Sequence, residues 1–225
     1  MRTHTKDFQA NLTPRQAFDL LVEGNRRFVN NLRLNRNLLQ QVNETSDGQY
    51  PFAIVLSCID SRTSAELVFD QGLGDIFSVR IAGNVLNEDI LGSMEFACEI
   101  AGSKLIVVLA HTRCGAIKGA CSYVELGHLT GLLGKIGAAI HDVESSGGRH
   151  LAPEAFVEQV AVENMRHQLR AIVDRSPILQ RLFQEGRIGL VGGVYSVESG
   201  DVTFFEQRFT EAPDVAEVAA TAPRG

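Results

Sequence analysis

The sequence lacks the features that mark several large classes of proteins. No apolar run approaches the roughly 20 residues that a membrane-spanning helix needs. The first residues contain neither an apolar stretch nor a small-residue cleavage pattern, so we expect no signal peptide. Lys and Arg number 21 against 27 Asp and Glu and form no block, unlike the basic surfaces that bind nucleic acid or anionic membranes. The sequence therefore predicts a cytoplasmic protein that binds neither nucleic acid nor membranes.

Cysteines are also few. The four are Cys58, Cys98, Cys114 and Cys121. In a small secreted protein an even number would indicate disulfides, but in a cytosolic chain of 225 residues metal binding or simple burial is more common. With 44% apolar residues the chain is long enough for one core, so we expect one domain with helical arms.

Strand-like and helical segments alternate along the chain. The strand-like runs are residues 52–58, 76–81, 105–110 and 188–197, and the helical segments are residues 64–69, 90–101 and 153–174. The first run is continuously apolar, as in a strand that is covered on both faces, and the others are similar. This alternation predicts an α/β fold with a central, mostly parallel sheet of four strands flanked by helices. Residues 203–205, after a turn, predict an antiparallel edge strand.

The two ends of the chain differ from this central part. Thr13, Pro14 and Gln16 form the start signal of a helix, with a capping box and a proline in the first turn. We assign residues 1–50 to an N-terminal helical arm and residues 51–210 to the α/β domain. Residues 211–225 are rich in Ala, Pro and Thr, and we expect them to be disordered.

Three metal-binding residue types stand at strand ends. Cys58 closes the first strand, His111 follows the third, and Cys114 comes three residues later. The carboxyl ends of parallel strands share one edge of a sheet, so these side chains can converge there. Two thiolates and an imidazole suit zinc, and three protein ligands leave a fourth position free, as in catalytic sites. Taken alone, Cys58 is just as readily a small buried hydrophobe.

Asp60 and Arg62 lie beside Cys58 on the same predicted loop. A carboxylate bound by a guanidinium stays ionised and acts only as a hydrogen-bond acceptor. Near a metal, such a carboxylate can orient a nucleophilic water or hydroxide toward a substrate. The alternative is a surface ion pair of little consequence.

These residues, together with other blocks, closely resemble the β-class carbonic anhydrases. The resemblance rests on residues 24–28, 48–51, 58–62, 69–84, 92–97, 111–116 and 193–195. It spans about residues 14–206 and implies reversible hydration of carbon dioxide to bicarbonate by attack of zinc-bound hydroxide. It further implies one zinc ion per chain, held by Cys58, His111 and Cys114 in the α/β catalytic domain, with Asp60 and Arg62 as catalytic residues.

The resemblance also implies partners and a substrate pocket. Relatives form homodimers by exchanging N-terminal helices, often paired into tetramers, and their active sites lie near the dimer interface. By position, Gln49, Phe77 and Phe96 resemble residues that line the carbon dioxide pocket, and we add Gly115 to the substrate-binding set. Core packing is the alternative for the two phenylalanines, and a surface role is as plausible for Gln49.

The chain departs from the family pattern at a few positions. Ile59, Thr63 and Ala110 replace the Ser, Val and Gly that are common there, but every ligand and the Asp60–Arg62 pair are retained. In some relatives the aspartate itself closes the site by binding zinc, and those that stabilise this form with a second bicarbonate use a tryptophan. Because this chain has no tryptophan, we expect an open site.

Other functions compete with this interpretation. A hydrolase of carbon disulfide or carbonyl sulfide would use similar zinc chemistry, and a zinc-stabilised interaction module would use the same ligands without catalysis. A phosphate-binding protein is a weaker alternative, because the glycines near Gly72 and Gly83 do not match phosphate-binding loops.

Overall fold

The computed structural model describes residues 3–210 and contains a five-stranded sheet. The strands are β1 (Ala53–Ser57), β2 (Ile76–Arg80), β3 (Leu105–His111), β4 (Gly189–Tyr195) and β5 (Val202–Arg208), in the order β2-β1-β3-β4-β5. Strands β1 to β4 are parallel, and β5 is antiparallel to β4. The predicted sheet of four parallel strands with an antiparallel edge strand is thereby confirmed. The predicted disorder of residues 211–225 lies outside the described residues.

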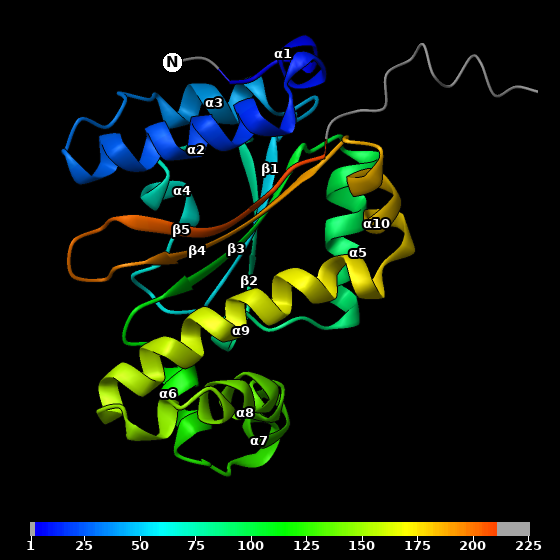
Figure 1. Ribbon diagram of the computed structural model, residues 1–225. Helices are drawn as coiled ribbons and strands as arrows, with labels where there is room; N and C mark the ends of the chain where they lie inside the picture. The colour runs from blue at the N-terminus through cyan, green and yellow to red at the C-terminus, as the bar shows by residue number, and fades with distance from the viewer. Residues whose placement is uncertain (1–2, 211–225) are drawn as a thin grey trace, which may run out of the picture.

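Helices surround this sheet (Figure 1). They are α1 (Lys6–Asn11), α2 (Pro14–Val29), α3 (Leu38–Glu44), α4 (Ala65–Val68), α5 (Glu88–Glu95), α6 (Gly115–Cys121), α7 (Gly127–Gly134), α8 (Gly137–Ser145), α9 (Pro153–Arg175) and α10 (Pro177–Gln184). Short turns η1 (Ala82–Asn84), η2 (Phe96–Ile100) and η3 (Gly148–His150) complete the described elements. No described helix combines the length and the apolar character needed to cross a membrane.

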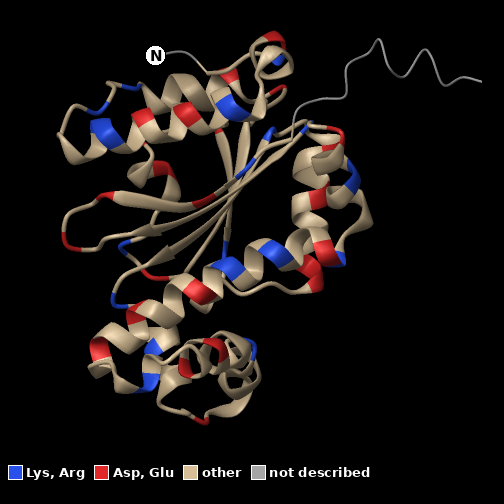
Figure 2. Cartoon of the chain, in the orientation of Figure 1, with Lys and Arg blue, Asp and Glu red and all other residues tan. Residues whose placement is uncertain are grey.

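The two faces of the sheet bury separate cores. Alternate residues of the strands, such as Ile54 and Val108, pack against α5, α9 and α10. The intervening residues, such as Val55 and Val107, pack against α2 and α4 on the other face. Charged residues of both signs are scattered over the helices (Figure 2). The continuous apolar runs of β1 and β3 therefore reflect strands that are covered on both sides.

Two elements differ from the sequence-based expectation. Strand β2 lies at the edge of the sheet, so only Ile76 is fully buried and the strand is not covered on both faces. The helix expected over residues 90–101 divides into α5 and the wider π-turn η2, after which the chain turns toward β3. The segment between Cys114 and Pro153 forms α6, α7 and α8. These pack with α9 around a third core that contains Cys58 and Cys114.

Helix α9 lies very close to strand β4 because of a glycine. A Cβ atom on Gly192 would approach Sδ of Met165 to 2.1 Å. Real Cβ atoms do not tolerate such a distance, so a larger residue at position 192 would force the buried Met165 side chain of α9 to move. This approach sets the height of α9 above the sheet, and with it the position of the α9 side chains that face the third core.

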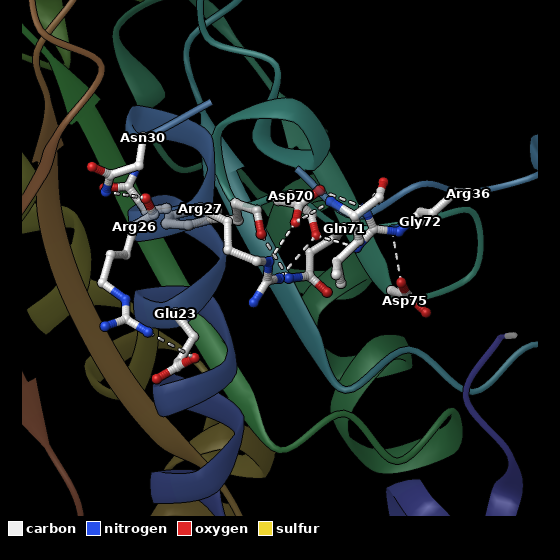
Figure 3. Close-up of polar contacts among 12 residues, drawn as sticks. Glu23, Arg26, Arg27, Asn30, Arg36, Asp70, Gln71, Gly72 and Asp75 are labelled. Carbon is white, nitrogen blue, oxygen red and sulfur yellow. Dashed lines mark hydrogen bonds and ion pairs between the residues drawn. The ribbon is translucent and has the colours of Figure 1, made fainter. Parts of the chain in front are cut away.

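The N-terminal arm is attached to the sheet by a buried carboxylate. Helix α2 begins with the predicted capping box of Thr13 and Gln16. At its other end, Arg27 donates from Nε to Asp70 Oδ2, and Arg36 also contacts Asp70 (Figure 3). The Asp70 side chain is 2% exposed, so two guanidiniums compensate for one buried charge. Burial would raise the pKa of Asp70, but the hydrogen bonds from Arg27 and Arg36 hold it below its usual value.

We predict that Asp70→Asn lowers the free energy of unfolding by about 3 kcal/mol, because it leaves two guanidiniums without their buried counter-charge. Urea unfolding at pH 7 measures this loss. The matched control is Glu23→Gln, which breaks the exposed Glu23–Arg26 pair. We expect the control to change stability by less than about 0.5 kcal/mol. Equal effects of the two substitutions would contradict the role of Asp70.

The same carboxylate predicts a pH dependence. Because the pKa of Asp70 is lower in the folded state than in the unfolded chain, its contribution is complete above the ordinary carboxyl pKa of about 4. It declines as the pH falls through the lowered pKa. The stability difference between the natural protein and Asp70→Asn should therefore shrink steadily below about pH 4. A difference that stays constant down to pH 2 would contradict this assignment.

Candidate metal centre

The three predicted ligands meet at the carboxyl edge of the sheet. Cys58 follows β1, His111 is the last residue of β3, and Cys114 is the residue that precedes α6. Ser57 pairs with Leu109 in the register of β1 and β3, so the two strands end at nearly the same height. The sulfur and imidazole nitrogen atoms of the three residues lie within 4.8 Å of one another, and all three side chains are buried.

His111 presents one nitrogen to the two sulfurs. Its Nδ1 lies 2.9 Å from the carbonyl oxygen of Thr112, where a protonated Nδ1 donates a hydrogen bond. This contact leaves Nε2 as the atom with a free lone pair, and Nε2 is buried without a hydrogen-bond partner among the described residues. An unpartnered buried nitrogen beside two sulfurs is the arrangement that a tetrahedral metal ion would satisfy.

The two thiols share a proton in the absence of a cation. Their sulfurs lie 3.9 Å apart. The hydrogen bond from Cys114 lowers the pKa of Cys58 to about 4 against the opposing effect of burial, with smaller help from His111 and the Gly83 N–H. The same interaction raises the pKa of Cys114. A divalent cation would replace the shared proton and stabilise both thiolates.

The other two cysteines behave differently. Burial raises the pKa of Cys98 to about 12 and that of Cys121 to about 11. Both therefore remain protonated thiols, and neither belongs to a group of potential ligands among the described residues. The donor set of this chain is thus consistent with a zinc site of two cysteines and one histidine.

Asp60 and Arg62 form the predicted pair beside this site. Arg62 donates from Nε to Asp60 Oδ1 at 2.9 Å and from Nη2 to Oδ2 at 2.8 Å. These hydrogen bonds lower the pKa of Asp60 well below its usual value. Asp60 is not a member of the group of three donors whose ligand atoms lie within 4.8 Å of one another.

Two side chains hold the loop that carries this pair. The Thr63 hydroxyl donates to the carbonyl oxygens of Cys58 and Asp60. Arg80 donates from Nε to the Cys58 carbonyl oxygen at 3.0 Å and also reaches the Asp60 carbonyl oxygen. Arg80 was not among the predicted site residues. It ends β2 at the same sheet edge, however, so the strand-end rule that located Cys58 would also have found it.

The loop from His111 to Cys114 is braced from another side. Arg113 has φ of 56°, in the left-handed region that non-glycine residues adopt rarely. Its backbone N–H donates to Glu158 of α9 at 2.7 Å. The Thr112 hydroxyl accepts from the backbone N–H of Val197 at 3.0 Å. Helix α9 therefore contacts the ligand-bearing loop directly, which nothing in the sequence pattern indicated.

The predicted substrate residues are spread over the chain. Gly115 begins α6 next to Cys114. Phe77 pairs with Ile54 in the sheet, about 13 Å along β1 from Cys58. Gln49 precedes β1, so it lies at the opposite end of the strands from the metal centre. Within a single chain, Gly115 is therefore the only one of these predicted substrate residues that lies next to the metal ligands.

Phe77 and Phe96 instead form an apolar wall at the surface. Their rings lie 6.3 Å apart in an edge-to-face arrangement. They line a hollow of about 620 Å³ beside the edge strand β2, together with Ile54, Val79 and Ser93. The Phe96 side chain is 55% exposed, which is unusual for a core phenylalanine. This exposure disfavours core packing as the role of Phe96 in a single chain.

The fold and the site together define a class of protein, an α/β scaffold with a buried group of two cysteines and one histidine at its sheet edge that could hold a metal ion. Comparison with known proteins agrees. A family model described as carbonic anhydrase matches residues 53–202. The chain therefore belongs to the carbonic anhydrase family, and within it to the β class, whose members are carbonate dehydratases.

Individual relatives cover most of the chain. "Carbonic anhydrase 2" of Mycobacterium tuberculosis is 34% identical over 202 residues, which are 84% of this chain and 92% of that protein. The carbonic anhydrase of Mycolicibacterium smegmatis is 32% identical, over 85% and 93% of the two chains. Among solved structures, the β-carbonic anhydrase CcaA has a TM-score of 0.67 at 27% identity, over 84% and 95% of the two chains.

We predict that His111→Ala and Cys114→Ser each reduce bound zinc from about one ion per chain to a small fraction, because two remaining donors do not fill a tetrahedral site. Metal analysis of purified protein gives the stoichiometry. Cys98→Ala is the matched control, since it removes a buried thiol that lies outside the ligand group. Loss of zinc in the control, or retention in both ligand variants, would contradict the assignment.

Proposed function

We infer that this chain hydrates carbon dioxide reversibly to bicarbonate and a proton at a zinc ion held by Cys58, His111 and Cys114. The observation that carries the assignment is the buried donor cluster, in which two coupled thiols face an unpartnered imidazole nitrogen. Zinc bound there would act as a Lewis acid and make a water molecule acidic enough to serve as nucleophile near neutral pH. Membership of the carbonic anhydrase family supports the same reaction.

The protein contributes the orientation of the nucleophile. Asp60 is ionised and bound by Arg62 at both oxygens, so it can only accept a further hydrogen bond, through its remaining lone pairs. Its lowered pKa keeps it ionised throughout the neutral and alkaline range. When the nucleophilic water or hydroxide directs its O–H bond at Asp60, the reactive lone pair of the nucleophile points away from Asp60, toward the substrate. Asp60 and Arg62 thus act as a unit that aims the attack.

We propose that a second copy of the chain completes the substrate pocket. Phe77 and Phe96 form an apolar wall on the exposed edge of the sheet, and Gln49 is exposed at the far end of β1. Apolar walls with one amide suit an uncharged linear molecule such as carbon dioxide. Structures of two β-carbonic anhydrases from Sordaria macrospora are described as tetrameric, and one has a TM-score of 0.67 to this chain.

We assign dimerisation to the arm of residues 1–50 and catalysis to residues 51–210. The arm carries exposed apolar side chains, including Leu32, Leu38, Leu39 and Val42. Such a group of exposed leucines is typical of a surface that another chain covers. We also propose a cytoplasmic location, because four free cysteines and a thiolate metal site suit a reducing compartment.

We predict that Asp60→Asn lowers the rate of carbon dioxide hydration about 100-fold while zinc content stays at one ion per chain, because an amide can turn an N–H toward the nucleophile and misdirect it. Stopped-flow hydration with a pH indicator measures the rate. The matched control, Glu185→Gln, alters the exposed Arg181–Glu185 pair at the end of α10 and should leave the rate unchanged. A full rate in Asp60→Asn would favour a non-catalytic zinc module.

We predict that Phe96→Asp dissociates the assembly and lowers kcat/KM for carbon dioxide at least about tenfold, because a buried charge would replace an aromatic anchor of the interface. Sedimentation velocity and stopped-flow rates on the same sample test this, and zinc content should not change. Tyr123→Asp alters an aromatic side chain that is 75% exposed and distant from β2, so it serves as control. An active monomer would refute the shared pocket.

A further inference from the structure

A chain of buried hydrogen bonds connects helix α9 with the metal centre. Asn164, which is 0% exposed, donates from Nδ2 to the carbonyl oxygen of Gly83 at 2.8 Å. Gln168, one turn later, donates to Asn164 Oδ1 at 3.0 Å and accepts from the backbone N–H of Leu86 at 2.9 Å. The backbone N–H of Gly83 in turn points at Sγ of Cys58, 3.4 Å away.

The turn that this chain braces has one backbone hydrogen bond of its own, from the Asn84 N–H to the Ile81 carbonyl oxygen at 2.9 Å. Gly83 has φ of 69° and Asn84 has φ of 45°, so two successive residues lie in the left-handed region. That region costs a non-glycine residue about 1 kcal/mol, and such turns persist where surrounding contacts fix them. Asn164 and Gln168 supply those contacts from the opposite side of the third core. They anchor the turn at two further backbone groups, the Gly83 carbonyl oxygen and the Leu86 N–H.

Both ends of the Asn164 amide are used, which fixes its orientation. The oxygen accepts from Gln168 while the nitrogen donates to Gly83, so a flipped amide would lose both bonds. The surrounding third core is otherwise apolar, with Val160 and Ala161 on the same helix. A buried amide in such surroundings destabilises the fold unless it is fully bonded, whereas a fully bonded network is rigid.

We propose that Asn164 is a positioning residue for the metal centre: by holding the Gly83 carbonyl oxygen it fixes the turn in which the preceding peptide, between Ala82 and Gly83, directs its N–H at the Cys58 thiolate. This inference rests on the proposed function in taking Cys58 as a metal ligand. An N–H···S hydrogen bond withdraws charge from a thiolate, orients it, and keeps the metal more electrophilic. Helix α9 thereby influences how strongly the Cys58 thiolate donates electrons to the metal, although Asn164 and Cys58 are more than one hundred residues apart in sequence.

The test uses Asn164→Leu, which keeps a similar volume but removes the amide, in the full-length protein loaded with cobalt(II) or zinc. The sulfur-to-cobalt charge-transfer absorption reports the electron density on the thiolates. Competition with a chelator gives zinc affinity. We expect a shifted charge-transfer band and an affinity that is lower by about 10- to 100-fold, the range for lost outer hydrogen bonds to ligands.

The matched control is Ile172→Ala on the same helix. Ile172 is fully buried, but it packs in the core on the α5 and α10 side rather than around Cys58. This substitution should lower the melting temperature and leave both the cobalt spectrum and zinc affinity unchanged. If Asn164→Leu keeps the cobalt spectrum and the zinc affinity of the natural protein, even with a lowered melting temperature, the inference is overturned. Asn164 would then serve only the stability of the helix.

A second variant protects the test against misfolding. Gln168→Leu leaves Asn164 in place and removes the side chain that orients its amide, so we expect a spectral shift in the same direction but smaller. If Asn164→Leu does not fold, an unchanged spectrum in Gln168→Leu overturns the inference. Failure of the natural protein to bind cobalt would overturn the proposed metal site itself, which distinguishes that failure from a failure of the positioning role alone.

Discussion

The structure depends on one electrostatic constraint at the carboxyl edge of its sheet. Two thiol sulfurs lie 3.9 Å apart in a buried site, beside an imidazole nitrogen with no partner. A single shared proton satisfies the sulfurs but not the histidine, and two unpaired thiolates would repel each other in a medium of low dielectric. One divalent cation satisfies all three donors together. The loops, turns and helices around the site hold the donors at the distances that such an ion requires.

The parallel sheet supplies these distances, but it does not supply them alone. Strand register brings Cys58 and His111 to the same height, whereas Cys114 depends on the left-handed turn at Arg113. The Cys58 loop likewise depends on the turn at Gly83. Helix α9 contacts both turns, through Glu158 and Asn164. Its close packing on β4, which Gly192 permits, thus connects the core of the fold to the geometry of the site.

The sequence predicted the parts of this arrangement that have a local signal. Continuous apolar runs located the strands, and the rarity of Cys and His at strand ends located the ligand set. The exposure of β2 was missed although Ser78 and Arg80 alternate with its apolar residues, which is the pattern of a strand that is not covered on both faces. Asn164 and Glu158 gave no signal either, because polar residues are common on a long amphipathic helix. Only the packing shows which of them turn inward.

The positions of Gln49, Phe77 and Phe96 show that metal binding and substrate binding use different parts of the molecule. The sequence alone could not distinguish the two. Every donor of the metal centre, with its supporting hydrogen bonds, belongs to one chain and is buried within it. The apolar residues assigned to substrate lie instead on the surface. If a second copy completes the pocket as proposed, metal retention is a property of the folded chain, whereas access of carbon dioxide is a property of the assembly. Dissociation of the assembly would then abolish activity, while each chain would retain its metal.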